Sequence, residues 1–511
     1  MLFNSYNFMI FFPIVVLVYF FIPKKLRYIW LLIVSYYFYM GWNAEYALLI
    51  AFSTAATFLS GILIDWCNEK FCHIQTDQEA EIEKYNKYKK LIVVICFSVN
   101  IGILVFFKYF DFLLDNMNVL LSSVGEGVTL HKKFDVLLPV GISFYTFQAL
   151  SYSMDVYRGE IKAEKNFFRY ALFVSFFPQL VAGPIERSKN LLKQINSVEE
   201  INVWEYERVV QGLILMLWGL FQKMVIADRA AILVDQVYNS FWMYGSIELI
   251  LATVLFAVQI YCDFGSYSLI AIGCAKVMGF TLMENFNTPY FATSIKDFWR
   301  RWHISLSTWF KDYLYIPLGG NRCSDKRNSL NIVITFLVSG LWHGASWSFI
   351  AWGSLHGIYQ VIGKYLTPIK EKIKLKFHIK TENFSYKLGQ ILLTFVLVDF
   401  AWIFFRMNSL KQSIQFIIRI VSRWDSWVLF DKSLYTIGLN QTEVHILILS
   451  LAILFLVDLV RYLKGVTIDI FLSEQNLWFK WTVALLLLFG IIIFGIYGPS
   501  LEARQFIYFQ F

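Results

Sequence analysis

The chain has 511 residues, of which 58% are hydrophobic and 16% are charged. Soluble domains carry about a quarter charged residues, so this composition excludes an ordinary soluble protein and predicts a polytopic membrane protein. The formal net charge is +8, but the basic residues are scattered among loops and form no basic stripe with interleaved aromatic residues. Basic loops that face a cytoplasm explain this charge better than nucleic-acid binding does.

The first apolar run, MLFNSYNFMIFFPIVVLVYFF, has no basic leader and no small-residue cleavage site, so it is interpreted as a retained first span. The basic segments 24–27 and 65–90 are both expected on the cytoplasmic side, with two spans between them and the N-terminus outside. No internal repeat is visible, which weakens a transporter interpretation. Because no polar stretch is long enough to build a separate core, we expect one domain over 1–511.

Further apolar runs recur along the whole chain. A membrane span needs about 20 residues, so an all-α integral membrane protein with about 11 to 13 transmembrane or re-entrant helices is predicted. The runs near 246–275 and 330–365 are too long for one straight helix, whereas those near 29–42 and 137–154 are short. The other runs lie near 45–64, 91–110, 167–182, 208–227, 386–405, 443–461 and 477–498.

The six cysteines form no CxxC pair. Cys67, Cys72 and His73 lie close together in sequence, but the fourth ligand of a zinc site is missing. We therefore expect no metal site and interpret the cysteines as structural thiols.

One segment, KDFWRRWHISLSTWFKDYLYIPLGGNR (296–322), gathers arginine, histidine, serine and tryptophan within a few turns. If 299–313 is one helix, its aromatic residues share a face and its basic residues lie beside them. This pattern predicts an amphipathic helix at the membrane interface. His303 lies at the margin between the two sides, where it can face a pocket between this helix and the bundle. In the alternative interpretation the helix only anchors the bundle, and its basic residues neutralise lipid phosphates.

No Asp, Glu, Lys or Arg occurs between Arg327 and Lys364, so His343 is an isolated ionisable residue in a long apolar run. A helix over 328–342 would be about 22 Å long, shorter than a hydrocarbon core of about 30 Å. A bend at the sequence HGAS therefore places His343 inside the membrane, where an ionisable residue is a functional candidate.

A second histidine in this run, His356, is flanked by Gly353 and Gly357, just as His343 is flanked by Gly340 and Gly344. Glycines at this spacing let helices approach closely, and we interpret His356 as a packing residue. An imidazole held neutral by burial can accept a proton from an alcohol and return it to a leaving group. No carboxylate is near in sequence, so the attacking alcohol is expected to come from the substrate.

At these residues the sequence resembles the membrane-bound O-acyltransferase family, specifically its bacterial branch similar to alginate O-acetyltransferases. Five blocks match in order: SFYTFQALSYSMDVYRGE (143–160), FFPQLVAGPIER (176–187), QIYCDFGSYSLIAIG (259–273), NFNTPYFATSIKDFWRRWHISLSTWFKDYLYIPLGGNR (285–322) and VSGLWHGASWSFIAWGSLHG (338–357). They cover a core of about 140–360. The resemblance implies a helical bundle, with amphipathic interfacial helices, around a central membrane-embedded tunnel.

The resemblance also implies the roles of individual residues. His343, in the sequence WHG, falls on the family's essential catalytic histidine, and His303 falls on its second polar catalytic position. Arg300, Trp302, Ser307 and Trp342 are the predicted substrate-binding residues. Arg300 is expected to contact donor phosphates, because a planar guanidinium suits them better than an ammonium does.

The implied function is transfer of acetyl from cytoplasmic acetyl-CoA, a substrate and not a bound cofactor, to a cell-surface or secreted polysaccharide. The implied partner is an extracytoplasmic esterase-like acetyltransferase, and the implied location is the bacterial plasma membrane, among lipids and without nucleic acid. Two alternatives stay open: D-alanyl transfer to teichoic acid from a carrier protein, and transport of a lipid-linked sugar. Neighbouring genes for an esterase-like protein would favour acetylation, and genes for a carrier protein with its ligase would favour D-alanylation.

Overall fold

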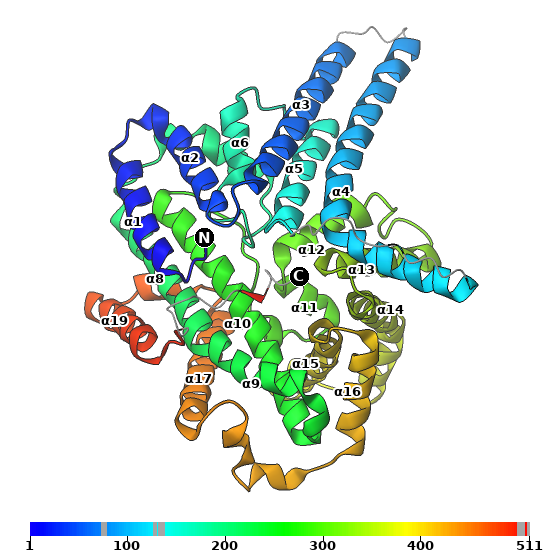
Figure 1. The fold of residues 1–511 in the computed structure, drawn as a ribbon, viewed down its shortest axis with the longest axis vertical. Coiled ribbons are helices and arrows are strands. Elements are labelled where there is room, and N and C mark those ends of the chain that lie inside the picture. Colours follow the sequence, from blue (N-terminus) through cyan, green and yellow to red (C-terminus); the bar gives the residue numbers. More distant parts are fainter. Residues whose placement is uncertain (73–78, 126–129, 131–137, 498–505, 508–511) are drawn as a thin grey trace. The chain divides into compact units, whose positions relative to one another are not determined.

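The computed structural model describes residues 1–72, 79–125, 130, 138–497 and 506–507. These residues form helices joined by turns and loops, with no strand in the described part of the chain (Figure 1). The all-α prediction is therefore confirmed. The chain separates into two compact units: unit 1 comprises 1–212 and 271–283, and unit 2 comprises 213–270 and 284–511.

Unit 1 contains the N-terminal helices. Ser5 caps the first of them, and its hydroxyl accepts a hydrogen bond from the Phe8 N–H group. The helices are α1 (Tyr6–Phe21), α2 (Arg27–Met40), α3 (Tyr46–Cys72), α4 (Glu79–Val124), α5 (Ile142–Tyr157), α6 (Phe167–Ser175) and α7 (Lys193–Asn196), with the start of α8 (Tyr206–Phe221) and the end of α10 (Ser246–Met278).

Unit 2 contains the remaining parts of α8 and α10 and the later helices. A π-helical segment, Gln222–Ala227, joins α8 to the next helix. The helices are α9 (Asp228–Asn239), α11 (Ile295–Arg301), α12 (Ile304–Phe310), α13 (Asp325–His343), α14 (Trp347–Lys376), α15 (Phe384–Arg406), α16 (Leu410–Ser422), α17 (Gln441–Lys464), α18 (Ile468–Ser473) and α19 (Leu477–Phe494).

Seven helical segments in the described part of the chain are long and apolar enough to cross a membrane. They are Tyr46–Lys70, Glu81–Ser123, Tyr206–Asn239, Ser246–Met278, Phe384–Arg406, Gln441–Lys464 and Leu477–Phe494. The protein is therefore a multi-pass membrane protein. Shorter apolar segments predicted from the sequence, such as α1 and α2, have 16 and 14 residues and fall below this length.

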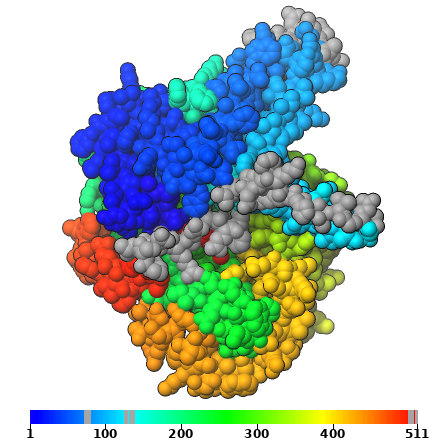
Figure 2. Space-filling model, viewed as in Figure 1, coloured from blue at the N-terminus to red at the C-terminus, as the bar shows by residue number. Residues whose placement is uncertain are grey.

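Figure 2 shows α3 and α4 at the surface of the molecule. Apolar side chains along both helices are exposed, among them Leu48, Phe52, Leu91 and Phe106. Contact of these side chains with water would be unfavourable, whereas contact with lipid hydrocarbon chains is favourable. The two helices therefore have the surface expected of lipid-facing spans.

The predicted interruption within 246–275 is wrong, because α10 is a single helix of 33 residues. Most of its apolar window, 72%, is buried inside the protein. Contacts with neighbouring helices along this length stabilise the helix, and it has no proline to end it. An apolar run gives the composition of a helix and does not fix where the helix ends.

The predicted interruption within 330–365 is confirmed. Helix α13 ends at His343, Gly344 adopts an extended conformation, and Ser346 caps the start of α14. The cysteine-rich stretch is described only in part: Cys67 is buried in α3, whereas His73 lies outside the described residues, and the expectation of no metal site there stays a prediction.

Unit 2 contains a buried ionic cluster at the π-helical segment. The Lys223 ammonium lies 2.6 Å from an Asp263 carboxylate oxygen and 2.9 Å from an Asp228 carboxylate oxygen. The second oxygen of Asp263 accepts a hydrogen bond from the backbone N–H group of Ile507 at 2.6 Å, and the Phe506 ring lies 4.3 Å from the ammonium. One cation thus joins α9, α10 and residues near the C-terminus.

Candidate active site

The segment that carries His303 is not the continuous helix predicted over 299–313. Helix α11 ends at Arg301, and α12 begins at Ile304. Between them Trp302 is extended, and His303 has the left-handed backbone angles φ 43° and ψ 54°. The chain therefore turns a corner at His303, and a helical wheel drawn over 299–313 gives a wrong position for His303 relative to the residues of α11.

Tertiary hydrogen bonds from Asn285 account for this corner. The Ile304 N–H group donates to the Asn285 carbonyl oxygen at 2.9 Å, in place of a carbonyl of the preceding helix. The Ser305 hydroxyl donates to the Asn285 side-chain oxygen at 2.6 Å, and the Asn285 amide donates to Ser268 at 2.9 Å. Because Asn285 lies outside the motif helix, the local sequence pattern gave no sign of the break.

The aromatic face of this segment packs against protein, whereas its position at the membrane interface stays a prediction. Trp302 and His303 are 1% and 0% exposed, and Leu306 is equally buried. The Trp302 ring packs between Phe286 and Trp402, with centroid distances of 4.9 and 5.0 Å. Within 299–313 only the polar residues Arg300 and Lys311 are exposed, so this part of the segment is a buried corner of unit 2.

His303 lies in an aromatic environment. Its ring meets the Phe264 ring edge-on at 4.6 Å, and the Trp342 ring lies 5.9 Å away. His303 is outside the seven candidate spans, and burial lowers the pKa of its imidazole to about 3. The ring is therefore neutral at physiological pH and keeps a nitrogen lone pair that can accept a hydrogen bond.

His343 is the last residue of α13 and is 3% exposed. Three aromatic rings surround its imidazole: Trp342 at 5.0 Å, Trp352 at 5.0 Å and Phe405 at 5.4 Å. They come from α13, α14 and α15. The bend after His343 thus places the imidazole among aromatic side chains of three helices.

The two predicted catalytic histidines lie together, although 40 positions separate them in sequence. Their ring centroids are 6.2 Å apart, and Trp342 contacts both rings. At this separation one bound reacting group is within reach of both imidazoles. We call this pair, with Phe264, Trp342, Trp352 and Phe405 around it, the histidine pocket.

The predicted substrate-binding residues divide into two groups. Trp342 belongs to the histidine pocket. Trp302 instead packs among aromatic rings of the core, and the Ser307 hydroxyl donates a 3.2 Å hydrogen bond to the Trp302 carbonyl oxygen at the corner. Arg300 is exposed on α11. Only Trp342 of the four is thus placed in direct ring contact with both histidines, and substrate binding by the others stays a prediction.

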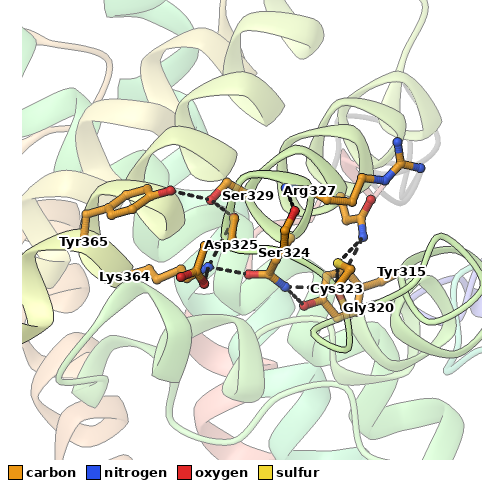
Figure 3. A network of polar contacts seen from close by, with 11 residues as sticks. Tyr315, Gly320, Cys323, Ser324, Asp325, Arg327, Ser329, Lys364 and Tyr365 are labelled. Atoms are coloured by element: carbon orange, nitrogen blue, oxygen red, sulfur yellow. Dashed lines mark hydrogen bonds and ion pairs between the residues drawn. The ribbon is translucent and has the colours of Figure 1, made fainter.

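The opposite end of α13 is held by a polar network that sequence reasoning did not identify (Figure 3). Gly320, in a turn with positive φ, presents its carbonyl oxygen to the side-chain amides of Asn328 at 3.0 Å and Asn331 at 3.3 Å. Lys364 of α14 donates to the Asn328 side-chain oxygen at 2.9 Å and pairs with Asp325 at 2.8 Å. The network fixes the start of α13 to the preceding loop and to α14.

The sequence of the chain matches known proteins over most of its length. Residues 160–397 match the model of the membrane-bound O-acyltransferase family. The probable alginate O-acetylase AlgI of Pseudomonas putida is 32% identical over 524 residues, covering 100% of both chains. AlgI of Pseudomonas aeruginosa is 36% identical over 80% of this chain and 73% of its own length, and the peptidoglycan O-acetyltransferase of Helicobacter pylori is 35% identical over 76% and 72%.

The chain belongs to the membrane-bound O-acyltransferase family, and it is an O-acyltransferase. Among its relatives, those named alginate O-acetylases and peptidoglycan O-acetyltransferase are bacterial proteins. The matched range includes the corner at His303 and the whole of α13 and α14. The family resemblance inferred from the five sequence blocks is therefore confirmed.

Proposed function

We propose that the protein transfers acetyl from acetyl-CoA, across the bacterial plasma membrane, to a hydroxyl group of an acceptor. An extracytoplasmic partner then completes the transfer onto a cell-surface or secreted polysaccharide. The observation that carries this proposal is the histidine pocket, in which two buried imidazoles lie 6.2 Å apart between aromatic walls. The names of the relatives, which refer to alginate and peptidoglycan, support a polysaccharide as the final acceptor.

In the proposed reaction the neutral His343 imidazole accepts the proton of the attacking hydroxyl as its oxygen bonds to the acetyl carbonyl carbon. When the carbon–sulfur bond breaks, His343 returns that proton to the departing thiolate, so that an acetyl ester and free CoA result. His303 donates or accepts a hydrogen bond to the reacting group and orients it. The aromatic walls exclude water, which would otherwise hydrolyse the thioester.

The course of α13 supports entry of the donor from the cytoplasmic side. Five lysines (370, 372, 374, 376 and 380) cluster at and just after the end of α14, as expected of a cytoplasmic loop. Lys364, nearby on α14, is bonded to the start of α13. His343 lies at the other end of α13, about 27 Å along the helix axis, so a donor that enters from that side would have to reach most of the way across a hydrocarbon core of about 30 Å.

To test the proposal, the gene is deleted and the ester-linked acetyl content of the cell-surface polysaccharides is measured. Membrane vesicles containing the protein and the candidate partner are then supplied with acetyl-CoA labelled in the acetyl group. We expect the acetyl content to fall and the vesicles to form labelled ester in a gene-dependent manner. An unchanged acetyl content together with lost D-alanyl esters would contradict the proposal.

The role of His303 is tested by substitutions matched to its backbone conformation. Asn and Gly tolerate left-handed backbone angles, whereas Leu does so poorly. We therefore expect His303→Asn to retain more acetyl transfer than His303→Gly, since Asn keeps a hydrogen-bonding group and both preserve the corner. Initial rates in vesicles give the comparison. Equal rates for the Asn and Gly variants would exclude a hydrogen-bonding role, and His303→Leu would show the added effect of backbone strain.

Arg300 and Arg301 are expected to have different roles. Arg301 pairs with Asp297 at 3.0 Å and donates to the Thr288 hydroxyl at 3.2 Å. Arg300 is exposed, and within the described part of the chain the structure gives it no ion pair. We expect Arg300→Lys to raise the KM for acetyl-CoA several-fold through weaker phosphate contact, and Arg301→Lys to lower thermal stability slightly. If the KM for acetyl-CoA is the same in both variants and in wild type, Arg300 does not contact the donor, and lipid headgroups are its partners instead.

A further inference from the structure

His356, which the sequence suggests is a packing residue, has a specific partner in α11. Its Nδ1 atom accepts a hydrogen bond of 3.2 Å from the indole N–H group of Trp299. His356 is fully buried, and Trp299 is 8% exposed. Fifty-seven positions separate the two residues, so the bond joins α14 to the helix that leads directly into the His303 corner.

The hydrogen bond determines which tautomer the imidazole adopts. Because Nδ1 accepts, the proton of the neutral ring is on Nε2. Nε2 is buried and has no hydrogen-bond partner among the described residues. A buried N–H group without a partner is unfavourable, and a phenylalanine at position 356 would avoid this cost. The distinctive contribution of the histidine is therefore the acceptor that Nδ1 offers to Trp299.

His356 is also fixed relative to His343. The Trp352 ring lies 5.0 Å from the His343 ring and 5.1 Å from the His356 ring. The two helices that carry these histidines meet at Gly340 and Gly353, where an added Cβ atom on Gly340 would lie 3.3 Å from the Gly353 Cα atom and would clash with the Phe349 carbonyl oxygen. The two helices therefore form a closely packed hairpin, and His356 moves with His343.

We infer that His356 is a positioning residue: its hydrogen bond to Trp299 sets the place of the His303 corner relative to the α13–α14 hairpin and so maintains the separation of the two imidazoles in the histidine pocket. Trp299 is four positions before His303 and belongs to the last turns of α11. A shift of α11 along α14 would move His303 relative to His343. The inference rests on the proposed acetyl transfer for its readout.

The test compares four variants by their kcat and KM for acetyl-CoA in membrane vesicles: His356→Phe, Trp299→Phe, the double variant and His356→Asn. The first two remove one partner each, and an Asn side-chain oxygen can replace Nδ1 as acceptor. We expect kcat to fall about 10- to 100-fold in each Phe variant with KM nearly unchanged, because misplaced reacting groups slow the chemical step. The kcat of the double variant should be no lower than that of the slower single variant. His356→Asn should keep most of the wild-type kcat.

Trp30→Phe is the matched control, since it removes an indole hydrogen bond of 3.1 Å to the Val15 carbonyl oxygen in unit 1. Size-exclusion profiles and thermal midpoints of all variants identify losses that come from misfolding. The inference is overturned if the His356 and Trp299 variants match Trp30→Phe, if the two effects multiply in the double variant, or if His356→Asn is as slow as His356→Phe. Wild-type protein that transfers no acetyl would instead contradict the proposed function.

Discussion

Replacing His343 with alanine is expected to abolish acetyl transfer while the protein still inserts and folds. The imidazole is the proposed base, and the rings around it (Trp342, Trp352 and Phe405) offer no group that can accept a proton. Loss of a general acid–base group typically costs about 10²- to 10⁴-fold in rate. The measurements are the ester-linked acetyl content of cells that carry only the variant and the initial rate in vesicles.

The matched control is His445→Ala, because His445 is an exposed histidine of α17. It should leave both measurements unchanged. Both variants should reach the membrane in wild-type amounts and give the same size-exclusion profile. Wild-type acetyl content in cells that contain only His343→Ala would rule out His343 as the base.

Replacing Lys223 with methionine is expected to lower the free energy of unfolding more than any of the other substitutions. Methionine has a similar length but no charge, so Asp228 and Asp263 would be left as two buried carboxylates beside each other. Removing one partner of a buried ion pair costs about 3–5 kcal/mol, a large part of the stability of a typical domain. The measurement is the thermal midpoint of the detergent-solubilised protein, with the yield of monodisperse protein as a second readout.

Asp263→Asn is the comparison variant. It leaves Lys223 paired with Asp228, and the asparagine oxygen can still accept the hydrogen bond from the Ile507 N–H group. The loss in thermal midpoint should therefore be smaller than in Lys223→Met. If both variants were as stable as wild type, the cluster would contribute nothing to folding, and its role would have to be sought elsewhere.

Sequence patterns were informative about the site where the signal was local. The bend after His343 followed from the length of the apolar run and from HGAS, and the WHG sequence identified the histidine itself. The turn at Gly319 and Gly320 is local in the same way, because both residues have positive φ, which glycine adopts readily. In each case a few neighbouring residues decide the conformation, so a short window of sequence is sufficient.

The remaining features depend on residues that are distant in sequence. The corner at His303 is produced by Asn285, and neither Gly nor Pro marks the break. The hydrogen bond between Trp299 and His356 crosses 57 positions, and the two carboxylates around Lys223 come from two helices, α9 and α10, with Asp263 lying 40 positions after the lysine. A pattern of hydrophobic residues also cannot show whether an aromatic face meets lipid or protein, so the pattern did not reveal that Trp302 packs in the protein core.

The contact between Gly340 and Gly353 has a consequence for how the molecule can move. Where two backbones touch, no side chain is available to change rotamer and let one helix slide past the other, so α13 and α14 must move as one rigid body. Any opening that admits a donor and releases a product must then come from the elements that face this hairpin, namely the corner at His303 and the side chains of α15 such as Phe405.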